Sequence, residues 1–305
     1  MPYDVLIIGS GPAGCTAAIY AARANLKTLV LAGYEAGGQL MITSDVENFP
    51  GFAEAVTGPK LMAEMRKQAE RFGAVFKDKD ATAVDFTMRP FKATSDSGVH
   101  EGRTVIVATG SSAKWLGLPS ETKLRGHGVS ACATCDGFFF KEKEVVVVGG
   151  GDSAMEEATF LTKYATKVTI IHRRDSFKAS KIMAARAMNH PKIKILFDTI
   201  VEEILGDATV TGVRIKDKAG KVSVYPCQGY FSAIGHNPNT ALFKGQLHLD
   251  EAGYIMQEGE YDTYTSVPGV FVAGDVRSES AKRVASAVGE GAMAVMLVHR
   301  YLEKL

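Results

Sequence analysis

The chain has 305 residues, with 35 basic and 34 acidic side chains and a net charge of +1. At about 150 residues per domain, this length predicts two domains. So balanced a charge provides no general field for nucleic acid or an anionic membrane, and we expect neither as a partner. The N-terminus lacks a signal-peptide pattern, and no apolar run approaches the ~18 residues of a membrane helix. We therefore expect a cytoplasmic protein.

A strand, a glycine-rich turn and a helix are predicted at the start of the chain. Residues 5–9 are a β-branched apolar run, residues 13–24 are small and helix-forming, and residues 29–31 form a second strand. The turn reads Gly9-Ser10-Gly11-Pro12-Ala13-Gly14. In such a fingerprint the glycines permit a tight turn, close approach of a pyrophosphate and close helix packing. A single motif of this kind is also compatible with a simple strand-to-helix turn.

The middle of the chain carries additional strands and then a cysteine pair. Residues 80–109 alternate strand-like runs with turns, and residues 111–120 have the composition of a crossing linker. Cys132 and Cys135 follow, with Asp136 beside them. Two thiols at this spacing can form a redox-active disulfide, and a neighbouring carboxylate can move protons, although it can also simply cap a turn. A zinc site would need two more ligands, and Cys15 and Cys227 form no second pair.

The strand-turn-helix pattern then restarts. Residues 145–148 predict a strand, residues 153–164 a helix and residues 168–171 another strand, with Gly149-Gly150-Gly151-Asp152-Ser153-Ala154 at the turn. A second linker-like stretch at 235–239 precedes a strand within 269–275 and a helix at 283–302. The pattern predicts an α/β fold with two Rossmann-like dinucleotide-binding domains, one inserted into the other. The expected domains are residues 1–113 and 241–305 for the first, and 114–240 for the second.

The residues after each second strand indicate which nucleotide each domain binds. His172, 23 residues after Gly149, begins a basic segment with Arg173, Arg174 and Lys178. Cations in place of the acid of an NAD site favour the 2′-phosphate of NADPH, although the segment can also be read as a solvated basic helix start. The same count from Gly9 reaches Ala32, which is neither acid nor base, while Asp275 offers a carboxylate for a ribityl hydroxyl. FAD is therefore favoured for the first site.

These segments together resemble the low-molecular-weight thioredoxin reductases over essentially the whole chain. The resemblance implies a homodimer that reduces thioredoxin with NADPH through FAD and a Cys132–Cys135 disulfide. The matching segments are Gly9 to Gly14, Gly37-Gly38-Gln39-Leu40, Glu47-Asn48-Phe49-Pro50-Gly51, Ala108-Thr109-Gly110, Cys132 to Gly137, Gly149 to Ala154, His172-Arg173-Arg174 and Gly274-Asp275-Val276.

The resemblance also implies which residues bind the cofactors. For FAD they are Gly9, Ser10, Gly11, Pro12, Ala13, Gly14, Glu35, Gly38, Gln39, Leu40, Asn48, the backbone of Val84, Ala108, Gly110, Asp275, Arg283, Val284 and Ala285. For NADPH they are Gly151, Asp152, Ser153, Ala154, His172, Arg173, Arg174 and Lys178. No metal ligands are expected.

By the same resemblance, Cys135 faces the flavin, Cys132 attacks the protein substrate and Asp136 is the acid-base group. The pair precedes Gly149 by only 14 residues, so it shares the inserted domain with NADPH. Both cannot occupy the flavin at once, so we expect this domain to rotate on linkers near 111–118 and 235–241.

Two residues depart from the family pattern, and four other functions compete with the one that the resemblance implies. Val284 replaces a glutamine beside the flavin, and Lys178 replaces an arginine, which should weaken the preference for NADPH. A related flavin reductase without a dithiol is disfavoured by Cys132 and Cys135, and an oxygen-using dithiol oxidase is disfavoured by the basic segment. A reductase of another thioredoxin-like or small-molecule disulfide, or a non-catalytic nucleotide sensor, stays open.

Overall fold

The computed structural model describes residues 1–43 and 45–305, and the chain divides into two units. Unit 1 comprises Met1–Ser112 and Asn237–Leu305, and unit 2 comprises Ala113–His236. The chain thus leaves unit 1, builds unit 2 and returns. The fold class is α/β, with a mainly parallel sheet in each unit.

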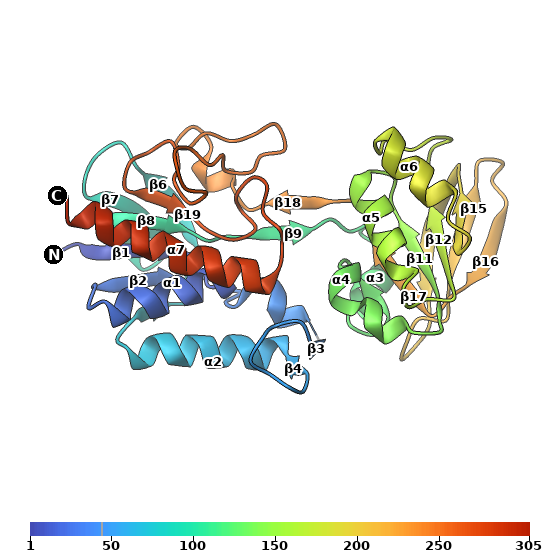
Figure 1. Cartoon of the computed structure of the whole chain (residues 1–305), viewed down its shortest axis with the longest axis horizontal. Coiled ribbons are helices and arrows are strands. Elements are labelled where there is room, and N and C mark those ends of the chain that lie inside the picture. The colour runs from blue at the N-terminus through green and yellow to red at the C-terminus, as the bar shows by residue number, and fades with distance from the viewer. Residues whose placement is uncertain (44) are drawn as a thin grey trace. The chain divides into compact units, whose positions relative to one another are not determined.

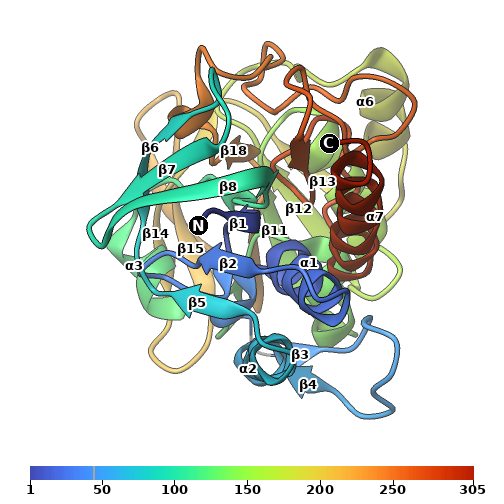
Figure 2. The same cartoon turned by 90° about the vertical axis from the view of Figure 1, so that its left-hand side faces the viewer.

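Unit 1 is built on a seven-stranded sheet in the order β5-β2-β1-β8-β7-β6, with β19 also paired to β8 (Figure 2). Strands β5, β2, β1, β8 and β19 are parallel, whereas β7 and β6 are antiparallel. The strands are β1 Tyr3–Ile8, β2 Thr28–Leu31, β5 Val75–Lys77, β6 Ala81–Asp85, β7 Phe91–Ser95, β8 Gly98–Val107 and β19 Val270–Val272. The first half of β8 pairs with β7 and the second half with β19, so β8 is the strand that joins the parallel and antiparallel parts.

Both faces of the central strands are covered, which explains their unbroken apolar runs. On one face, Ile7 and Ile106 belong to a buried cluster with the alanines of α1 (Pro12–Arg23) and the apolar residues of α7 (Val284–Leu302). On the other face, Leu6 lies in a second cluster with Phe243. The sequence therefore gives no inside-outside alternation here, because no face of these strands meets water.

Helices α1 and α7 pack side by side in unit 1 (Figure 1). A Cβ on Gly291 would lie 2.3 Å from the carbonyl oxygen of Ala13, so the two helices approach to backbone distance. The other elements of unit 1 are η1 Gly38–Ile42, β3 Asp45–Val46, β4 Val56–Thr57, α2 Gly58–Arg71 and η3 Ala241–Phe243. Of the helices in the described residues, none combines the length and apolarity needed to span a bilayer.

Unit 2 pairs a parallel sheet with a smaller antiparallel one. The parallel sheet has the order β10-β17-β11-β12-β13, and the antiparallel sheet has the order β14-β15-β16. Its strands are β10 Val129–Ser130, β11 Glu144–Val148, β12 Lys167–Ile171, β13 Ile193–Leu196, β14 Thr199–Leu205, β15 Gly212–Asp217, β16 Val222–Pro226 and β17 Gly229–Ser232. Its helices are α3 Pro119–Leu124, α4 Ala133–Asp136, η2 Gly137–Phe140, α5 Asp152–Leu161 and α6 Lys181–Met188.

The two faces of the parallel sheet in unit 2 have different covers. Val147 and Ile170 face a cluster that includes Met155 of α5. Val146 on the opposite face shares a cluster with Val213 of the antiparallel sheet. One face is thus packed by helices and the other by a second sheet.

The units join through two short strands that pair with each other, β9 (Ser111–Ala113) and β18 (His236–Pro238). The expected boundaries at 113 and 240 stand one and four residues beyond the ends at 112 and 236. Asn239 explains the second difference, because its N–H donates to the carbonyl of Gly110 at 3.0 Å and its side-chain amide donates to Thr109 at 2.8 Å. Residues 237–240 are therefore held by unit 1.

We expect Ile106→Ala to lower the free energy of unfolding by about 2–5 kcal/mol, because truncation of a fully buried side chain leaves a cavity. Val99→Ala on the same strand is the control. Val99 is 60% exposed, so its truncation should change the stability by less than about 0.5 kcal/mol. Equilibrium urea unfolding measures both variants, and equal losses would contradict the burial of β8.

Candidate functional site

The first glycine turn, between β1 and α1 in unit 1, is crowded by backbone atoms. A Cβ on Gly9 would lie 2.3 Å from the carbonyl oxygen of Ala108, and one on Gly14 would lie 2.0 Å from the carbonyl oxygen of Gly9. Gly9 also has a φ of +109°. A side chain at either position would push the turn away from the end of β8, so both glycines are required by the packing.

Ser10 ties this turn to two neighbouring segments. Its hydroxyl donates to the carbonyl of Ala32 at 2.8 Å and accepts from the N–H of Gly37 at 3.0 Å. Gly38 then lies against Gly11, since a Cβ on Gly38 would be 3.6 Å from the Gly11 Cα. The predicted segments at 9–14 and 37–40 are therefore brought together, with Ser10 buried between them.

The open side of the turn fits the pyrophosphate of a dinucleotide. A Cβ on Gly11 would meet nothing within 4 Å. Gly11 is the N-cap of α1, and the helix has neither a side-chain cap nor an acidic residue in its first turn. The free N–H groups at this end of α1 are thus available to an anion, and the helix dipole favours it.

A carboxylate lies close to this turn at the end of β19. Gly274 contacts Ala13, since a Cβ on Gly274 would be 3.0 Å from the Ala13 Cβ, and Asp275 follows it. Burial raises the pKa of the Asp275 carboxyl, and the positive charge of Lys282 opposes this shift. Ser280 donates a hydrogen bond to it over 3.4 Å. Such a carboxylate retains acceptor capacity for a sugar or ribityl hydroxyl.

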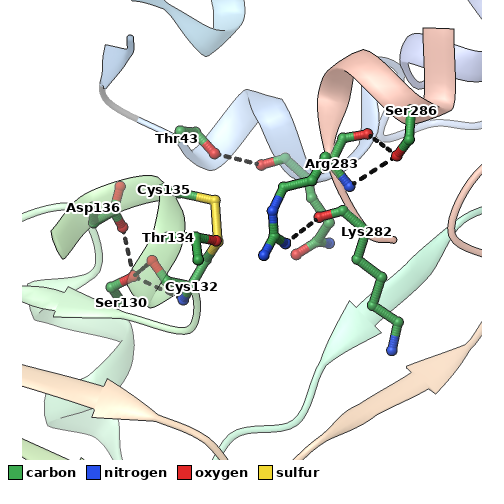
Figure 3. The surroundings of a disulfide bond; sticks show 10 residues. Thr43, Ser130, Cys132, Thr134, Cys135, Asp136, Lys282, Arg283 and Ser286 are labelled. Carbon is green, nitrogen blue, oxygen red and sulfur yellow. Dashed lines mark hydrogen bonds between the residues drawn. A yellow bond between two sulfur atoms is a disulfide. The ribbon is translucent and has the colours of Figure 1, made fainter. Parts of the chain in front are cut away.

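Three expected FAD residues lie outside these contacts. Glu35 is exposed in the turn after β2, and Asn48 is exposed in the loop between β3 and β4. Val84 is in β6, which β7 and β8 separate from β1 in the sheet order. A further expected FAD residue, Arg283, is the N-cap of α7, where its N–H donates to Ser286 Oγ at 3.3 Å (Figure 3).

Val284 and Leu40 share an apolar cluster. Leu40 is buried there with Cys15 and Met62, and Val284 packs against the cluster from the start of α7. The valine that departs from the family pattern therefore has apolar neighbours in this chain. Ala285 follows it in the first turn of α7.

The second glycine turn, between β11 and α5 in unit 2, repeats the backbone contact of the first. A Cβ on Gly149 would lie 2.3 Å from the carbonyl oxygen of Ala233. A Cβ on Gly150 would lie 2.2 Å from the His172 ring, and Gly151 has open space around it. Gly151 is also the N-cap of α5. The turn thus offers a second anion site.

A cavity of about 470 Å³ lies at this turn, within the size range of small-molecule sites. Asp152 and Ala154, both expected to bind the nucleotide, do not line it. Asp152 Oδ1 instead accepts from the N–H of Ser180 at 2.8 Å, and Ala154 is fully buried beneath Gly149. The lining residues are Leu116, Ser153 and Lys178 together with residues 148–151, 171–174, 199–201 and 233–235.

Three cations line this cavity without acidic partners. Arg173, Arg174 and Lys178 are exposed, and across residues 1–43 and 45–305 none of them forms an ion pair. The backbone N–H of Lys178 donates to the carbonyl of Gly150 at 2.8 Å, which holds the basic segment against the glycine turn. A phosphate at this position would meet charged donors that no carboxylate competes for.

His172 forms the floor of the cavity as a neutral ring. Its side chain is buried against Gly150 and 5.6 Å from the ring of Phe177. Burial lowers the pKa of His172, and the charges of Arg174 and Arg173 lower it further. Its Nε2 makes no hydrogen bond within the described residues. The positive charge of the site therefore comes from the arginines, not from this histidine.

The predicted cysteine pair is a disulfide in unit 2. Cys132 and Cys135 are joined by an S–S bond of 2.07 Å, with Cys132 as the N-cap of α4. The N–H groups of Cys135 and Asp136 donate to the carbonyl of Cys132 at 3.2 and 3.1 Å. Both sulfurs are thus used in the disulfide, as the redox interpretation predicts.

A serine that the sequence analysis did not select holds the carboxylate beside this disulfide. Ser130, the last residue of β10, donates its hydroxyl hydrogen to Asp136 Oδ2 and accepts from the N–H of Cys132 at 3.0 Å (Figure 3). The Asp136 carboxylate is therefore held by a specific partner. A disulfide with a carboxylate so placed can take part in thiol exchange with proton transfer. Only the folded contact reveals Ser130, because a serine before a cysteine has no distinctive sequence signal.

Comparison with known proteins agrees with this geometry. Residues 3–291 match the family described as pyridine nucleotide-disulphide oxidoreductase. The chain is 52% identical over 305 residues to a thioredoxin reductase of Rickettsia felis, covering 98% of both proteins. It is also 52% identical over 301 residues to one of Mycolicibacterium smegmatis, covering 98% of this chain and 96% of that protein. The solved structure of a thioredoxin reductase from Giardia duodenalis has a TM-score of 0.94 at 44% identity, covering 99% of both chains.

The thiols should differ sharply in reactivity. Burial raises the pKa of both Cys15 and Cys227 to about 12, so both stay protonated and unreactive near pH 8. We expect iodoacetamide to modify only Cys132 and Cys135 in the folded protein after reduction, as measured by mass spectrometry. Urea-unfolded protein is the control and should be modified at all four cysteines. Rapid labelling of Cys15 or Cys227 in the folded protein would contradict their burial.

Proposed function

Because the chain belongs to the pyridine nucleotide-disulphide oxidoreductase family and, within it, to the thioredoxin reductases, we propose that it reduces the disulfide of thioredoxin with NADPH. Its cofactors are FAD and NADPH. The observation that carries the proposal is the Cys132–Cys135 disulfide, which lies in the same unit as a cavity lined by unpaired cations. A redox centre and a nucleotide site in one unit are what such a relay requires.

The two glycine turns support separate cofactor sites. We assign FAD to unit 1, where the N-terminus of α1 would hold the pyrophosphate and Asp275 a ribityl hydroxyl. FAD, when bound, supplies a two-electron carrier between the nicotinamide and the disulfide. We assign NADPH to unit 2, where Arg173 and Arg174 would bind the 2′-phosphate through charge-assisted hydrogen bonds.

The reduced cysteine pair would then transfer two electrons by thiol exchange. The Cys132 thiolate attacks one sulfur of the thioredoxin disulfide, forming a mixed disulfide and releasing one thioredoxin thiolate, which takes up a proton. The Cys135 thiolate then attacks the Cys132 sulfur, restoring the internal disulfide and releasing the second thioredoxin thiolate, which takes up another proton. Asp136 directly follows Cys135 in the chain and serves as the acid-base group.

Three further features belong to this proposal. Unit 2 rotates on the β9 and β18 connections, because its nucleotide and its disulfide must reach the flavin in turn. The protein is a homodimer, and the exposed apolar side chains of Tyr20 on α1 and Met293 and Met296 on α7 support such an interface. It acts in the cytoplasm, where thioredoxin-type chemistry keeps thiols reduced.

We expect Cys135→Ser to abolish thioredoxin reduction while FAD stays bound and is still bleached by NADPH. The reason is that the variant cannot form the internal disulfide that accepts electrons from the flavin. Loss of NADPH absorbance with thioredoxin present measures turnover, and flavin absorbance measures the first step. Cys227→Ala is the control, since Cys227 is buried apart from the disulfide. Normal turnover by the Cys135 variant would remove the pair from the mechanism.

Replacing Arg173 and Arg174 together with alanine should raise the KM for NADPH at least about tenfold, because each charge-assisted hydrogen bond contributes roughly 1.5–3 kcal/mol. The KM for NADH, which lacks the 2′-phosphate, should change much less. Steady-state kinetics with both nucleotides measures the difference. The double variant Arg186→Ala/Lys221→Ala removes the same charge from unit 2 outside the cavity and should keep the wild-type ratio. Equal losses for both nucleotides would show that the arginines do not read the phosphate.

A further inference from the structure

The Ser130 hydroxyl connects the Asp136 carboxylate to the backbone N–H of Cys132. Its single hydrogen is directed to Asp136 Oδ2, and its oxygen accepts the N–H of Cys132 at 3.0 Å. The Cys132 carbonyl lies 3.5 Å away as a weaker alternative acceptor. A hydroxyl has one hydrogen and two lone pairs, so the bonds to Asp136 and Cys132 N–H can exist together. The serine thus joins the acid-base group to the backbone of the attacking cysteine.

We propose that Ser130 is a positioning residue for disulfide exchange at the Cys132–Cys135 pair. Its hydroxyl fixes the orientation of the Asp136 carboxylate and keeps this carboxylate ionised. This inference rests on the proposed function. A hydrogen bond donated to a carboxylate stabilises its charged form, so loss of the hydroxyl should raise the pKa of Asp136. Ser130 is only 7% exposed, so water cannot easily replace the hydroxyl in this bond.

The location of Ser130 makes the arrangement rigid. It lies on β10, whose Ser130 pairs in register with Phe231 of β17 in the parallel sheet. Helix α4 has only four residues, too few to hold a conformation by itself. Ala133 anchors α4 in a buried cluster, while the serine connects it to the sheet. The carboxylate is therefore oriented by a strand and not by its own short helix.

The titratable side chains of α5, a helix that packs against α4, are acidic. Of the elements with the main contacts to α4, η2 has no titratable side chain and α5 carries Asp152, Glu156 and Glu157. Asp152 accepts hydrogen bonds from Ser180. Negative charges on α5 would raise the pKa of Asp136, and the hydrogen bond from Ser130 acts in the opposite direction. Replacing Glu156 by glutamine should therefore lower the pKa of Asp136.

The test compares Ser130→Ala, Ser130→Thr and Asp136→Asn as holoenzymes, with thioredoxin reduction measured across pH. We expect Asp136→Asn to remove one inflection from the pH profile. Ser130→Ala should move that inflection upward by about one pH unit, which corresponds to the loss of one charge-assisted hydrogen bond. The KM for NADPH should be unchanged. Ser130→Thr keeps the hydroxyl and should restore the wild-type profile. Ser120→Ala is the matched control, because Ser120 also accepts a backbone N–H, that of Ile204 at 2.9 Å, but forms no hydrogen bond to a carboxylate within the described residues.

The proposal is overturned if the inflection stays in place in Ser130→Ala, or if Ser130→Ala lowers activity by the same factor in an Asp136→Asn background. It is also overturned if the wild-type profile has no inflection that depends on Asp136. A failure of the proposed function is distinguishable, because wild-type protein would then not reduce thioredoxin at all. In that case the pH dependence of iodoacetamide alkylation of the reduced dithiol, followed by mass spectrometry, measures the same shift without thioredoxin. An unchanged alkylation profile in Ser130→Ala would then overturn the role of Ser130.

Discussion

The structure depends on one steric constraint that occurs twice, the contact of a strand-to-helix glycine with the backbone of a neighbouring strand. A Cβ on Gly9 would lie 2.3 Å from the carbonyl oxygen of Ala108, and a Cβ on Gly149 would lie 2.3 Å from the carbonyl oxygen of Ala233. Because no side chain fits, each turn lies directly on the end of the adjacent strand. Each following helix then points its free N–H groups away from the sheet, at Gly11 in unit 1 and at Gly151 in unit 2, where a Cβ would meet nothing within 4 Å. One backbone device therefore creates two anion sites.

What differs between the two sites is the charge around them. Near the turn of unit 1 lies Asp275, a carboxylate whose pKa is raised by burial, while Ala32 closes the end of the second strand. At the turn of unit 2, Arg173 and Arg174 line the cavity and a neutral His172 closes its floor. The same fold thus presents an acceptor to one ligand and cationic donors to the other. With FAD and NADPH assigned to units 1 and 2 as proposed, these side chains and not the backbone would distinguish a flavin dinucleotide from a phosphorylated nicotinamide dinucleotide.

The sequence predicts the parts of this fold that have strong local signals. Residues 5–8 of the first predicted run lie in β1 and residues 145–148 lie in β11, and both fingerprints form the turns that their glycines indicate. The antiparallel sheet of β14 to β16 was not predicted, since it is specified by packing on the parallel sheet. Unit 2 ends at 236, four residues before the expected boundary at 240, and Asn239 is bound by a segment 130 residues away, which no local pattern shows. Asp152 and Ala154, two residues expected to bind the nucleotide, contact Ser180 and Gly149, which no local pattern shows either.

The disulfide is placed where redox change can be confined to the sulfur atoms. Its backbone is fixed by Ala133 in the core, by hydrogen bonds to the Cys132 carbonyl and by Ser130 on the Cys132 N–H. None of these contacts involves a sulfur atom, so opening the disulfide breaks none of them. These contacts can therefore persist when the disulfide is reduced. In the proposed cycle, the connections β9 and β18 would supply the motion of unit 2, while Ser130 holds the Asp136 carboxylate.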